Sequence, residues 1–260
     1  MHGELAYSTW PALSPTPVVL VPLGSTEQHG PHLPFSTDTI IASAVAQRVA
    51  TDLAIRGHCV VVAPALPYGA SGEHQNFPGT VSIGTEALTM VIVELVRSLS
   101  TWAGRIVLVN GHGGNLAALT ASVSLLRGEG HSVAWAPCTV ARGDAHAGLT
   151  ETSILLHLDA KLVDLASVVP GATTPMSALL GRLKSEGVRA VSPTGILGDP
   201  TGATATTGAA FMSEMCEGVQ RRILDESIDP RGCLRDLARS TAPAPAPAPA
   251  PAPDAMEDRP

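Results

Sequence analysis

Residues 105–127 read RIVLVNGHGGNLAALTASVSLLR, and the order of patterns in this stretch indicates the fold class. The stretch opens with Arg105–Val109, a run rich in Val and Ile of the kind that forms a buried strand. A short polar segment rich in Gly follows, and from Leu116 to Arg127 the apolar residues recur at helical spacing. We therefore predict a strand, a loop and a helix in direct succession, which is the repeating unit of an α/β protein.

The same order of elements extends along the chain on both sides of this stretch. Further apolar runs predict strands at Pro17–Val21, Cys59–Ala63 and Ser132–Ala136. Helical spacing predicts helices at Ile40–Leu53 and around Leu88–Leu99, the second with Thr85 as its N-cap and Gly104 as its stop. Alternating strands and helices predict a mainly parallel sheet covered by helices on both faces, within a single α/β domain over residues 1–240.

The C-terminal segment has a different composition. Ala242–Pro253 is a strict alternation of Ala and Pro, and Asp254–Pro260 follows it. Proline at every second position removes backbone donors and fixes φ, so an extended chain without a packed core is expected. We predict that residues 241–260 form a disordered tail.

Composition disfavours several classes of protein. The 260 residues carry 16 basic and 23 acidic side chains, a net charge of −7 that opposes binding to a phosphate backbone. No apolar stretch approaches the ~18 residues of a membrane span, and the N-terminal segment lacks the basic region of a signal peptide. The 4 cysteines are far apart, which suits a reducing cytosol. We expect a cytoplasmic protein that binds neither nucleic acid nor membrane.

Polar side chains gather in the loops that follow three of the predicted strands. They are Glu27, His29 and Asp38 after the first strand, His112 after the third, and Asp144, His146 and Glu151 after the fourth. Loops after the carboxyl ends of parallel strands meet at one edge of the sheet. Because imidazole and carboxylate together are the ligand set of zinc, manganese or iron in hydrolytic sites, the sequence predicts a metal centre at this edge.

Each of these elements has a simpler interpretation when it is taken alone. A Glu-x-His pair is a weak signal, and Asp38 lies where it could cap a helix. The segment Asn110–Asn115 is compatible with a turn or with the oxyanion loop of a serine esterase. The esterase requires a G-x-S-x-G motif, which the sequence lacks; the nearest run is Gly69–Glu73. The convergence of three loops at one sheet edge favours the metal centre.

Several blocks of the sequence carry a family resemblance. They are Ser25–Ile40 (STEQHGPHLPFSTDTI), Gly69–Val81 (GASGEHQNFPGTV), Val109–Leu116 (VNGHGGNL) and His146–Ile154 (HAGLTETSI). In order and spacing these blocks resemble the creatininase (creatinine amidohydrolase) family. Tyr68–Val91 and Gly195–Ala205 further resemble the branch of this family that belongs to the mycofactocin system. The resemblance implies a three-layer α/β/α fold and a two-metal amidohydrolase site.

The resemblance also implies roles for individual residues. Two divalent ions (zinc, iron or manganese) are implied, with Glu27 and His112 on one, His29 on the second and Asp38 bridging them. The match departs at Gly114, where creatininase has a Glu two residues after the histidine of its N-G-H motif. We infer that Glu151 replaces this missing ligand, because a dinuclear site needs enough anionic oxygen to neutralise two dications.

The expected chemistry is hydrolysis by an activated water, because metal coordination lowers the pKa of water toward ~7. His146 is suited to carry a proton to the departing amine; the alternative is that it orients Glu151. Glu151 has its own alternative role as a catalytic base, and Asp144 is placed to orient His146. Ser71 and His74, after the second strand, are expected to line the substrate pocket or to stabilise a turn.

Substrate and partners are the least determined by the residues. The resemblance implies a modified precursor peptide as substrate, from which the C-terminal dipeptide is released, and a homo-oligomer, hexameric or similar. The alternatives are a hydrolase of small cyclic amides or formamides and a metal-binding protein without turnover. With 3 Trp, 2 Tyr and 3 Phe, the chain offers few stacking platforms for a flat heterocycle, which favours the peptide.

Overall fold

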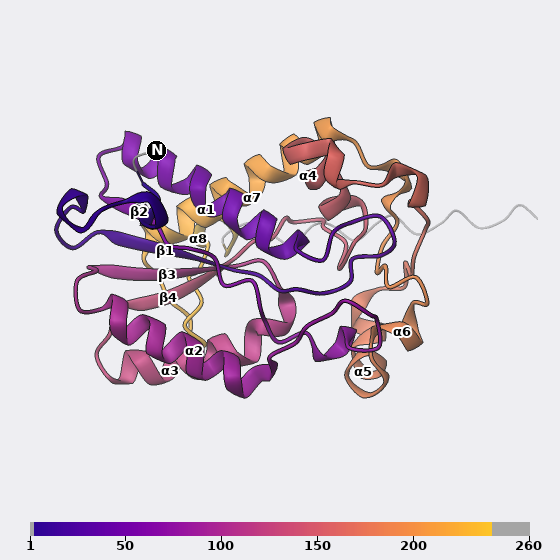
Figure 1. Cartoon of the computed structure of the whole chain (residues 1–260), viewed down its shortest axis with the longest axis horizontal. Coiled ribbons are helices and arrows are strands. Elements are labelled where there is room, and N and C mark those ends of the chain that lie inside the picture. The colour runs from indigo at the N-terminus through magenta and orange to yellow at the C-terminus, as the bar shows by residue number, and fades with distance from the viewer. Residues whose placement is uncertain (1–2, 241–260) are drawn as a thin grey trace, which may run out of the picture.

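The central element of the protein is a parallel β-sheet (Figure 1). A computed structural model describes residues 3–240, and the tail predicted at 241–260 lies outside these residues. Its strands are β1 (Val18–Leu23), β2 (Val60–Val62), β3 (Arg105–Asn110) and β4 (Val133–Pro137). They lie in the order β2-β1-β3-β4, and each neighbouring pair is parallel. The predicted strands and their parallel arrangement are confirmed.

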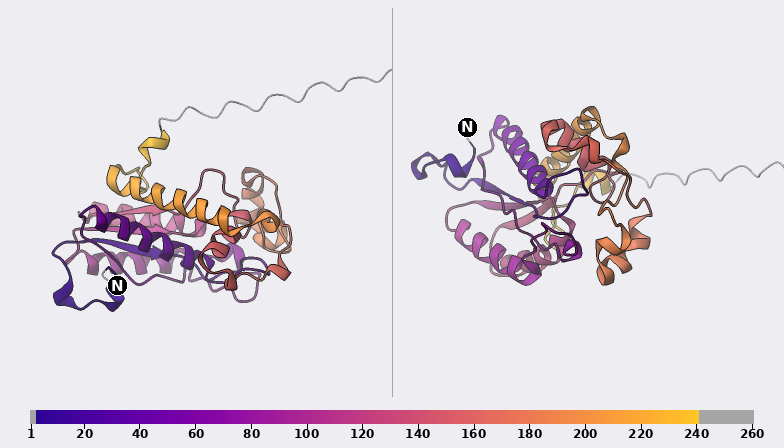
Figure 2. Two further views of the ribbon diagram at one scale, coloured as in Figure 1. Left: turned by 90° about the horizontal axis from the view of Figure 1, so that it is seen from above. Right: turned by 45° about the vertical axis from the view of Figure 1, so that its right-hand side comes forward.

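Helices cover both faces of this sheet, as the sequence predicted. They are α1 (Thr37–Ile55), α2 (Gly84–Leu99), α3 (Leu116–Gly128), α4 (Leu149–Asp159), α5 (Met176–Glu186), α6 (Val188–Val191), α7 (Ala205–Asp225) and α8 (Leu237–Ser240). Helices α1, α4 and α7 share one apolar core with the sheet, and α2 and α3 share the other. Figures 1 and 2 show the resulting three layers, with α5 and α6 beyond the carboxyl ends of the strands.

Two predicted helix boundaries were wrong. Helix α2 begins at Gly84, where φ is +77°, and Thr85 lies inside it, so Thr85 is not the N-cap. The helix ends at Leu99, before Gly104, where an added Cβ atom would lie too close to the Thr16 carbonyl. A glycine adopts the left-handed region at little cost, so Gly84 lets the chain turn sharply into the helix.

The loops that carry the site start at two neighbouring strands whose following helices lie on opposite faces of the sheet. Strand β1 leads into α1 on one face, whereas its neighbour β3 leads into α3 on the other face. The two connections therefore diverge at the carboxyl ends of β1 and β3, which is the usual ligand position in open α/β sheets. In the register of this pair, Leu23 lies opposite Asn110, so the loops that begin at residues 24 and 111 start side by side.

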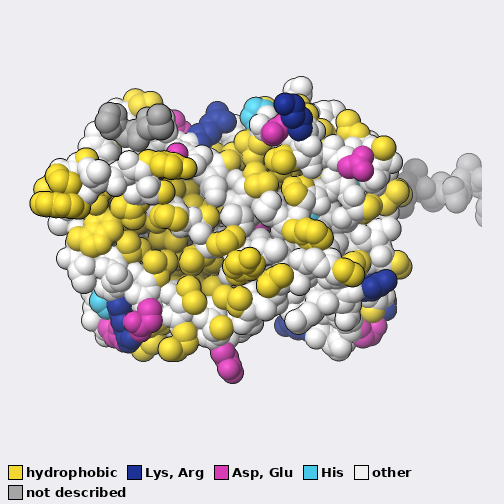
Figure 3. Space-filling view, viewed as in Figure 1, with side chains coloured by type: hydrophobic (Ala, Val, Ile, Leu, Met, Phe, Trp, Pro, Cys, Tyr) yellow, Lys and Arg dark blue, Asp and Glu magenta, His cyan; other side chains and the backbone are white. Residues whose placement is uncertain are grey.

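Two features of the helices and the surface bear on membrane and nucleic-acid binding. Among residues 3–240, no helix combines the length and the apolar composition that crossing a bilayer requires. On the face shown in Figure 3, Lys and Arg side chains lie apart from one another and form no basic stripe.

A close helix contact gives a stability prediction. Helices α4 and α7 pack so tightly that a Cβ atom on Gly208 would overlap the carbonyl of Ser153. We expect Gly208→Ala to lower the free energy of unfolding by about 1–3 kcal/mol, the usual cost of overpacking. Urea denaturation measures this change. Gly181→Ala, in α5 with open space around it, is the control and should be neutral or stabilising; equal effects of the two would contradict the packing argument.

Candidate metal centre

Asn115 ties the loops of the site together. Its side-chain nitrogen donates to the carbonyl of Gly24 at 3.0 Å and to Oδ1 of Asn110 at 3.1 Å. Its side-chain oxygen accepts the backbone N–H of Ala70 at 2.9 Å. One fully buried amide thus joins the loops that follow β1, β2 and β3 and holds their polar residues at one edge of the sheet.

Asp38 lies at the centre of the site. Helix α1 begins at Thr37, so Asp38 falls in its first turn, and its carboxylate accepts the Ser25 hydroxyl at 2.6 Å. Its Oδ1 lies 3.1 Å from Nε2 of His29, and its Oδ2 lies 3.3 Å from Nδ1 of His112. The two oxygens of one carboxylate therefore face two different histidines, which is the geometry of a bridging group rather than of a helix cap.

The remaining candidate residues divide between the two sides of Asp38. Potential ligand atoms that lie within 4.8 Å of one another form the group Glu27, Asp38 and His112, the group His29, His146 and Glu151, and a third group of Glu27, His74 and His146. All of these residues are buried except Glu151, which is half-buried. The structure thus brings together the five predicted ligands, Glu27, His29, Asp38, His112 and Glu151, with His146 beside them, whereas Asp144 belongs to none of these groups.

Three histidines are oriented by backbone carbonyls. Nδ1 of His29 lies 3.1 Å from the Glu27 carbonyl, and Nε2 of His112 lies 3.2 Å from the Ala70 carbonyl. Nε2 of His146 lies 2.8 Å from the Gln28 carbonyl. A carbonyl can only accept, so each of these nitrogens carries a proton. The other nitrogen of each ring faces a carboxylate, and Nε2 of His112 also lies 3.2 Å from Oε2 of Glu27. Histidines that bind metal ions usually donate their other N–H in this way.

The charges of the site suit a cation. Burial lowers the pKa of His29, but the adjacent Asp38 outweighs burial and raises it to about 10. Burial also lowers the pKa of His112, but the nearby Glu27 and Asp38 outweigh burial and raise it to about 10. Burial raises the pKa of Asp38, yet His29 and His112 hold it well below its usual range. In the absence of an ion, protons occupy the ring nitrogens that face Asp38; a divalent ion competes for the same nitrogens.

The two glutamates complete this picture. Burial raises the pKa of Glu27 and of Glu151 to about 7 in each case. Neither oxygen of Glu27 accepts a hydrogen bond from the part of the chain that the structure describes. Nε2 of His29 lies 3.7 Å from Oε2 of Glu151, so this carboxylate is close to the second group of ligands. Nε2 of His112 lies 3.2 Å from Oε2 of Glu27 but makes no hydrogen bond to it. A buried carboxylate is costly unless a cation pairs with it, so the residues present fit a metal ion.

The loop after β2 brings Ser71 and His74 into the same site. Ser71 is fully buried, and its hydroxyl lies 3.5 Å from Nε2 of His112. His74 lies in a short 3₁₀ turn, Gly72–His74, with Nε2 3.4 Å from Oε1 of Glu27. Burial and the nearby His112 and His29 lower the pKa of His74 to about 3, so its ring is neutral. Their predicted contact with substrate stays a prediction.

Asp144 has a different role from the one expected of it. Its carboxylate accepts the backbone N–H groups of Leu149 and Thr150, the second at 3.0 Å, and thereby caps the N-terminus of α4. The ring of His146 is held by the carbonyl of Gln28 instead. The expectation that Asp144 orients His146 was therefore wrong, because its carboxylate accepts hydrogen bonds from the otherwise unpaired N–H groups at the start of α4.

Comparison with known proteins decides the family. The family model described as creatinine amidohydrolase matches residues 6–223. The chain belongs to the creatininase family. It is therefore a hydrolase of C–N bonds, as its sequence predicted.

Relatives and solved structures agree with this membership. The mycofactocin precursor peptide peptidase of Mycolicibacterium smegmatis is 55% identical over 222 residues, with 85% of this chain and 90% of the relative covered. The protein of the same name from Mycobacterium tuberculosis (strain CDC 1551 / Oshkosh) is 52% identical over 238 residues, covering 89% and 95%. A creatininase structure with Mn has a TM-score of 0.68 at 27% identity and covers 86% of this chain and 98% of its own. A mutant creatininase of Zn-Zn type has the same TM-score of 0.68 at 26% identity, covering 86% and 97%.

Gly114 stands where the resemblance to creatininase implies a Glu, and other groups of this chain lie around its α-carbon. A side chain at position 114 would overlap the Ala70 carbonyl, the ring of His112 and the carboxylate of Glu73. Oε1 of Glu73 lies 3.6 Å from Nε2 of His112, so an anionic group from another loop occupies this place. Glu73 lies within the Gly69–Val81 block, and nothing in the spacing of residues 73 and 114 in the sequence indicates that they meet.

Proposed function

We propose that this chain is a two-metal peptidase that hydrolyses a modified mycofactocin precursor peptide near its C-terminus. The observation that carries the two-metal proposal is the position of Asp38, whose two oxygens face His29 at 3.1 Å and His112 at 3.3 Å. The peptide substrate is supported by the relatives that share 52% and 55% of their aligned residues with this chain and carry that substrate in their names.

The ligand assignment follows from the two groups around Asp38. Glu27 and His112 would hold one ion, His29 and Glu151 the other, and Asp38 both. The mixture of imidazole and carboxylate suits zinc, iron or manganese. When bound, such ions lower the pKa of water and polarise a carbonyl oxygen.

His146 is the proton carrier in this proposal. Its Nε2–H donates to the Gln28 carbonyl at 2.8 Å, which leaves Nδ1 unprotonated and 3.6 Å from Oε1 of Glu27. Burial, together with the nearby His29 and His74, keeps the pKa of His146 well below its usual range, so the ring is neutral and the lone pair of Nδ1 is free. Nδ1 accepts one proton from the attacking water and passes it to the amine nitrogen as the C–N bond breaks.

The test is a substrate comparison with the purified full chain. Metal content is measured by elemental analysis, and modified precursor peptide, unmodified precursor and creatinine are each incubated with the metal-loaded enzyme and followed by mass spectrometry. We expect the modified peptide to lose a small fragment built from its last two residues. Cleavage of creatinine alone, or of neither peptide with the ions present, would contradict the proposal and favour a small-amide hydrolase.

Location and assembly belong to the same proposal. We infer that the enzyme works in the cytoplasm as a homo-oligomer, hexameric or similar, with residues 1–240 as its catalytic domain. Sedimentation equilibrium of the full chain measures the number of subunits, and a monomer at micromolar concentration would contradict the oligomer.

Glu151→Gln tests the less direct ligand. The substitution keeps the shape of the side chain and removes its charge, so we expect selective loss of one of two bound ions per subunit. Elemental analysis of the purified variant measures this loss. Glu86→Gln, on an exposed residue in the first turn of α2, is the control. If the metal content stays unchanged while the rate collapses, Glu151 is a catalytic base and not a ligand.

A further inference from the structure

Gln28 lies between two proposed ligands, Glu27 and His29. Its buried side chain turns toward two further histidines of the site, His74 and His146. The orientation of its amide is fixed by two backbone groups. Oε1 accepts the N–H of Gly30 at 2.9 Å, and Nε2 donates to the carbonyl of Gly195 at 3.0 Å. An amide turned the other way would place its oxygen against the Gly195 carbonyl, so the nitrogen must be the atom that faces the histidines.

Counting protons then determines the state of both rings. The amide nitrogen of Gln28 has two hydrogens, and one of them is used on Gly195. The other is directed to Nδ1 of His74, at 2.8 Å, rather than to Nε2 of His146, at 3.1 Å. His74 therefore accepts at Nδ1 and, as a neutral ring, carries its proton on Nε2. His146 donates its own Nε2 proton to the Gln28 carbonyl at 2.8 Å.

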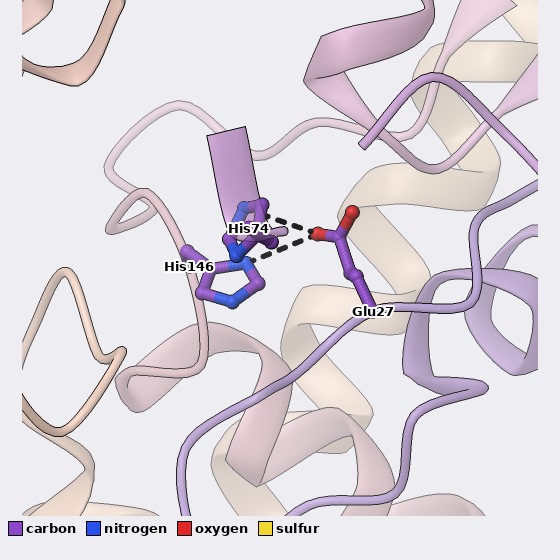
Figure 4. Close-up of side chains that lie close together, drawn as sticks. All are labelled: Glu27, His74 and His146. Carbon is purple, nitrogen blue, oxygen red and sulfur yellow. Dashed lines mark ion pairs between the residues drawn. The ribbon is translucent and has the colours of Figure 1, made fainter. Parts of the chain in front are cut away.

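The rings of His74 and His146 both face Oε1 of Glu27, one with a hydrogen-bond donor and the other with an acceptor (Figure 4). Nε2–H of His74 points toward Oε1 of Glu27 at 3.4 Å, and the bare Nδ1 of His146 lies 3.6 Å from the same oxygen. The ring centroids are 4.4 Å apart. One side of the site thus holds a hydrogen-bond donor beside a proton acceptor, and the donor makes no short hydrogen bond to Glu27 within the described residues.

This arrangement argues against a third metal site. Glu27, His74 and His146 lie close enough to hold an ion. However, Nδ1 of His74 is used by Gln28 and Nε2 is protonated, so this ring has no lone pair to offer a metal. Its chemistry is that of a donor.

We propose that His74 donates its Nε2–H to the carbonyl oxygen of the scissile amide and that Gln28 is the positioning residue that sets its tautomer. As the water oxygen bonds to the carbonyl carbon, the electron pair of the C=O double bond moves to oxygen, and His74 stabilises that charge without transferring its proton. The proton released by water goes to His146 and then to the amine. This inference rests on the proposed hydrolysis of an amide and adds the donor for its oxyanion.

Two substitutions of His74 test the donor. His74→Phe removes it, and we expect kcat to fall by roughly 10²–10³, the usual cost of losing an oxyanion donor, with KM within a few-fold and metal content unchanged. His74→Gln keeps an N–H near the position of Nε2 and should retain at least about tenfold more activity than the Phe variant. Equal activity of the Phe variant and the wild type would overturn the proposal, as would metal loss in both variants.

The tautomer is measured without any substrate. In the zinc-loaded and metal-free protein labelled with ¹⁵N-histidine, the His74 resonances, assigned by their loss in the Phe and Gln variants, should show Nε2 protonated and Nδ1 bare. Gln28→Glu places a carboxylate oxygen opposite Nδ1, so Nδ1 should become protonated and kcat should fall. A proton on Nδ1 in the wild type would overturn the assignment of His74 while leaving the hydrolase proposal intact. Absence of amide hydrolysis by the metal-loaded wild type would overturn both.

Discussion

Asp38→Ala is expected to abolish activity and to remove more bound metal than any other single substitution. The carboxylate faces His29 at 3.1 Å and His112 at 3.3 Å, so its loss removes a ligand from both proposed ions at once. Substitution of a residue that only supports a ligand costs roughly 10–100-fold in metal affinity, and the loss of a shared ligand should exceed that. Elemental analysis of the dialysed variant and the rate of peptide cleavage measure the two effects.

The control for this prediction lies on the same helix. Asp52 is near the far end of α1, well outside the ligand groups, and Asp52→Asn should retain both the metal content and the rate of the wild type. An Asp38→Ala enzyme that kept two ions per subunit and normal turnover would show that Asp38 does not bridge. A variant that kept one ion would assign it to one side of the site only.

The sequence could predict those residues of the site that lie in loops directly after the carboxyl ends of strands. Glu27 and His112 follow neighbouring parallel strands, whose register places Leu23 opposite Asn110. Any parallel sheet brings the loops after the carboxyl ends of its strands to the same edge. The prediction that Glu27 and His112 lie in one site therefore needs only the positions of the strands in the sequence. The strand order was not predicted from the sequence, and the structure places β1 beside β3. The resemblance to creatininase supplied the bridging role of Asp38.

The part that could not be predicted depends on contacts between loops. The tautomer of His146 is set by the carbonyl of Gln28, 118 residues away in sequence, and no hydrophobic or charge pattern encodes such a backbone contact. The position of Glu73 over Gly114 likewise depends on how closely the loop after β2 approaches the loop after β3. The start of α2 was also missed, because the chain enters the helix at Gly84 through a positive φ of 77° and Ile83, not Thr85, is the N-cap.

His146→Gln is expected to keep the metal ions and to lower kcat by roughly 10²–10⁴, the range for a positioned acid–base group. Glutamine can still donate an N–H to the Gln28 carbonyl, which His146 contacts at 2.8 Å, so the packing of the site should survive. What it lacks is the bare ring nitrogen that lies 3.6 Å from Oε1 of Glu27. Rates of peptide cleavage and metal content, measured on the same preparation, separate the loss of a proton carrier from the loss of a ligand.

A control variant and the metal content together distinguish a proton carrier from a metal ligand at His146. His58 is exposed and precedes β2, so His58→Ala should leave both rate and metal content unchanged. His146 also belongs to a ligand group with His29 and Glu151, and a drop in bound metal in His146→Gln would place it in the coordination shell instead. With metal retained, a normal rate would show that the proton reaches the amine by another route. The half-buried Glu151, whose pKa burial raises to about 7, would then be the next acid–base group to test.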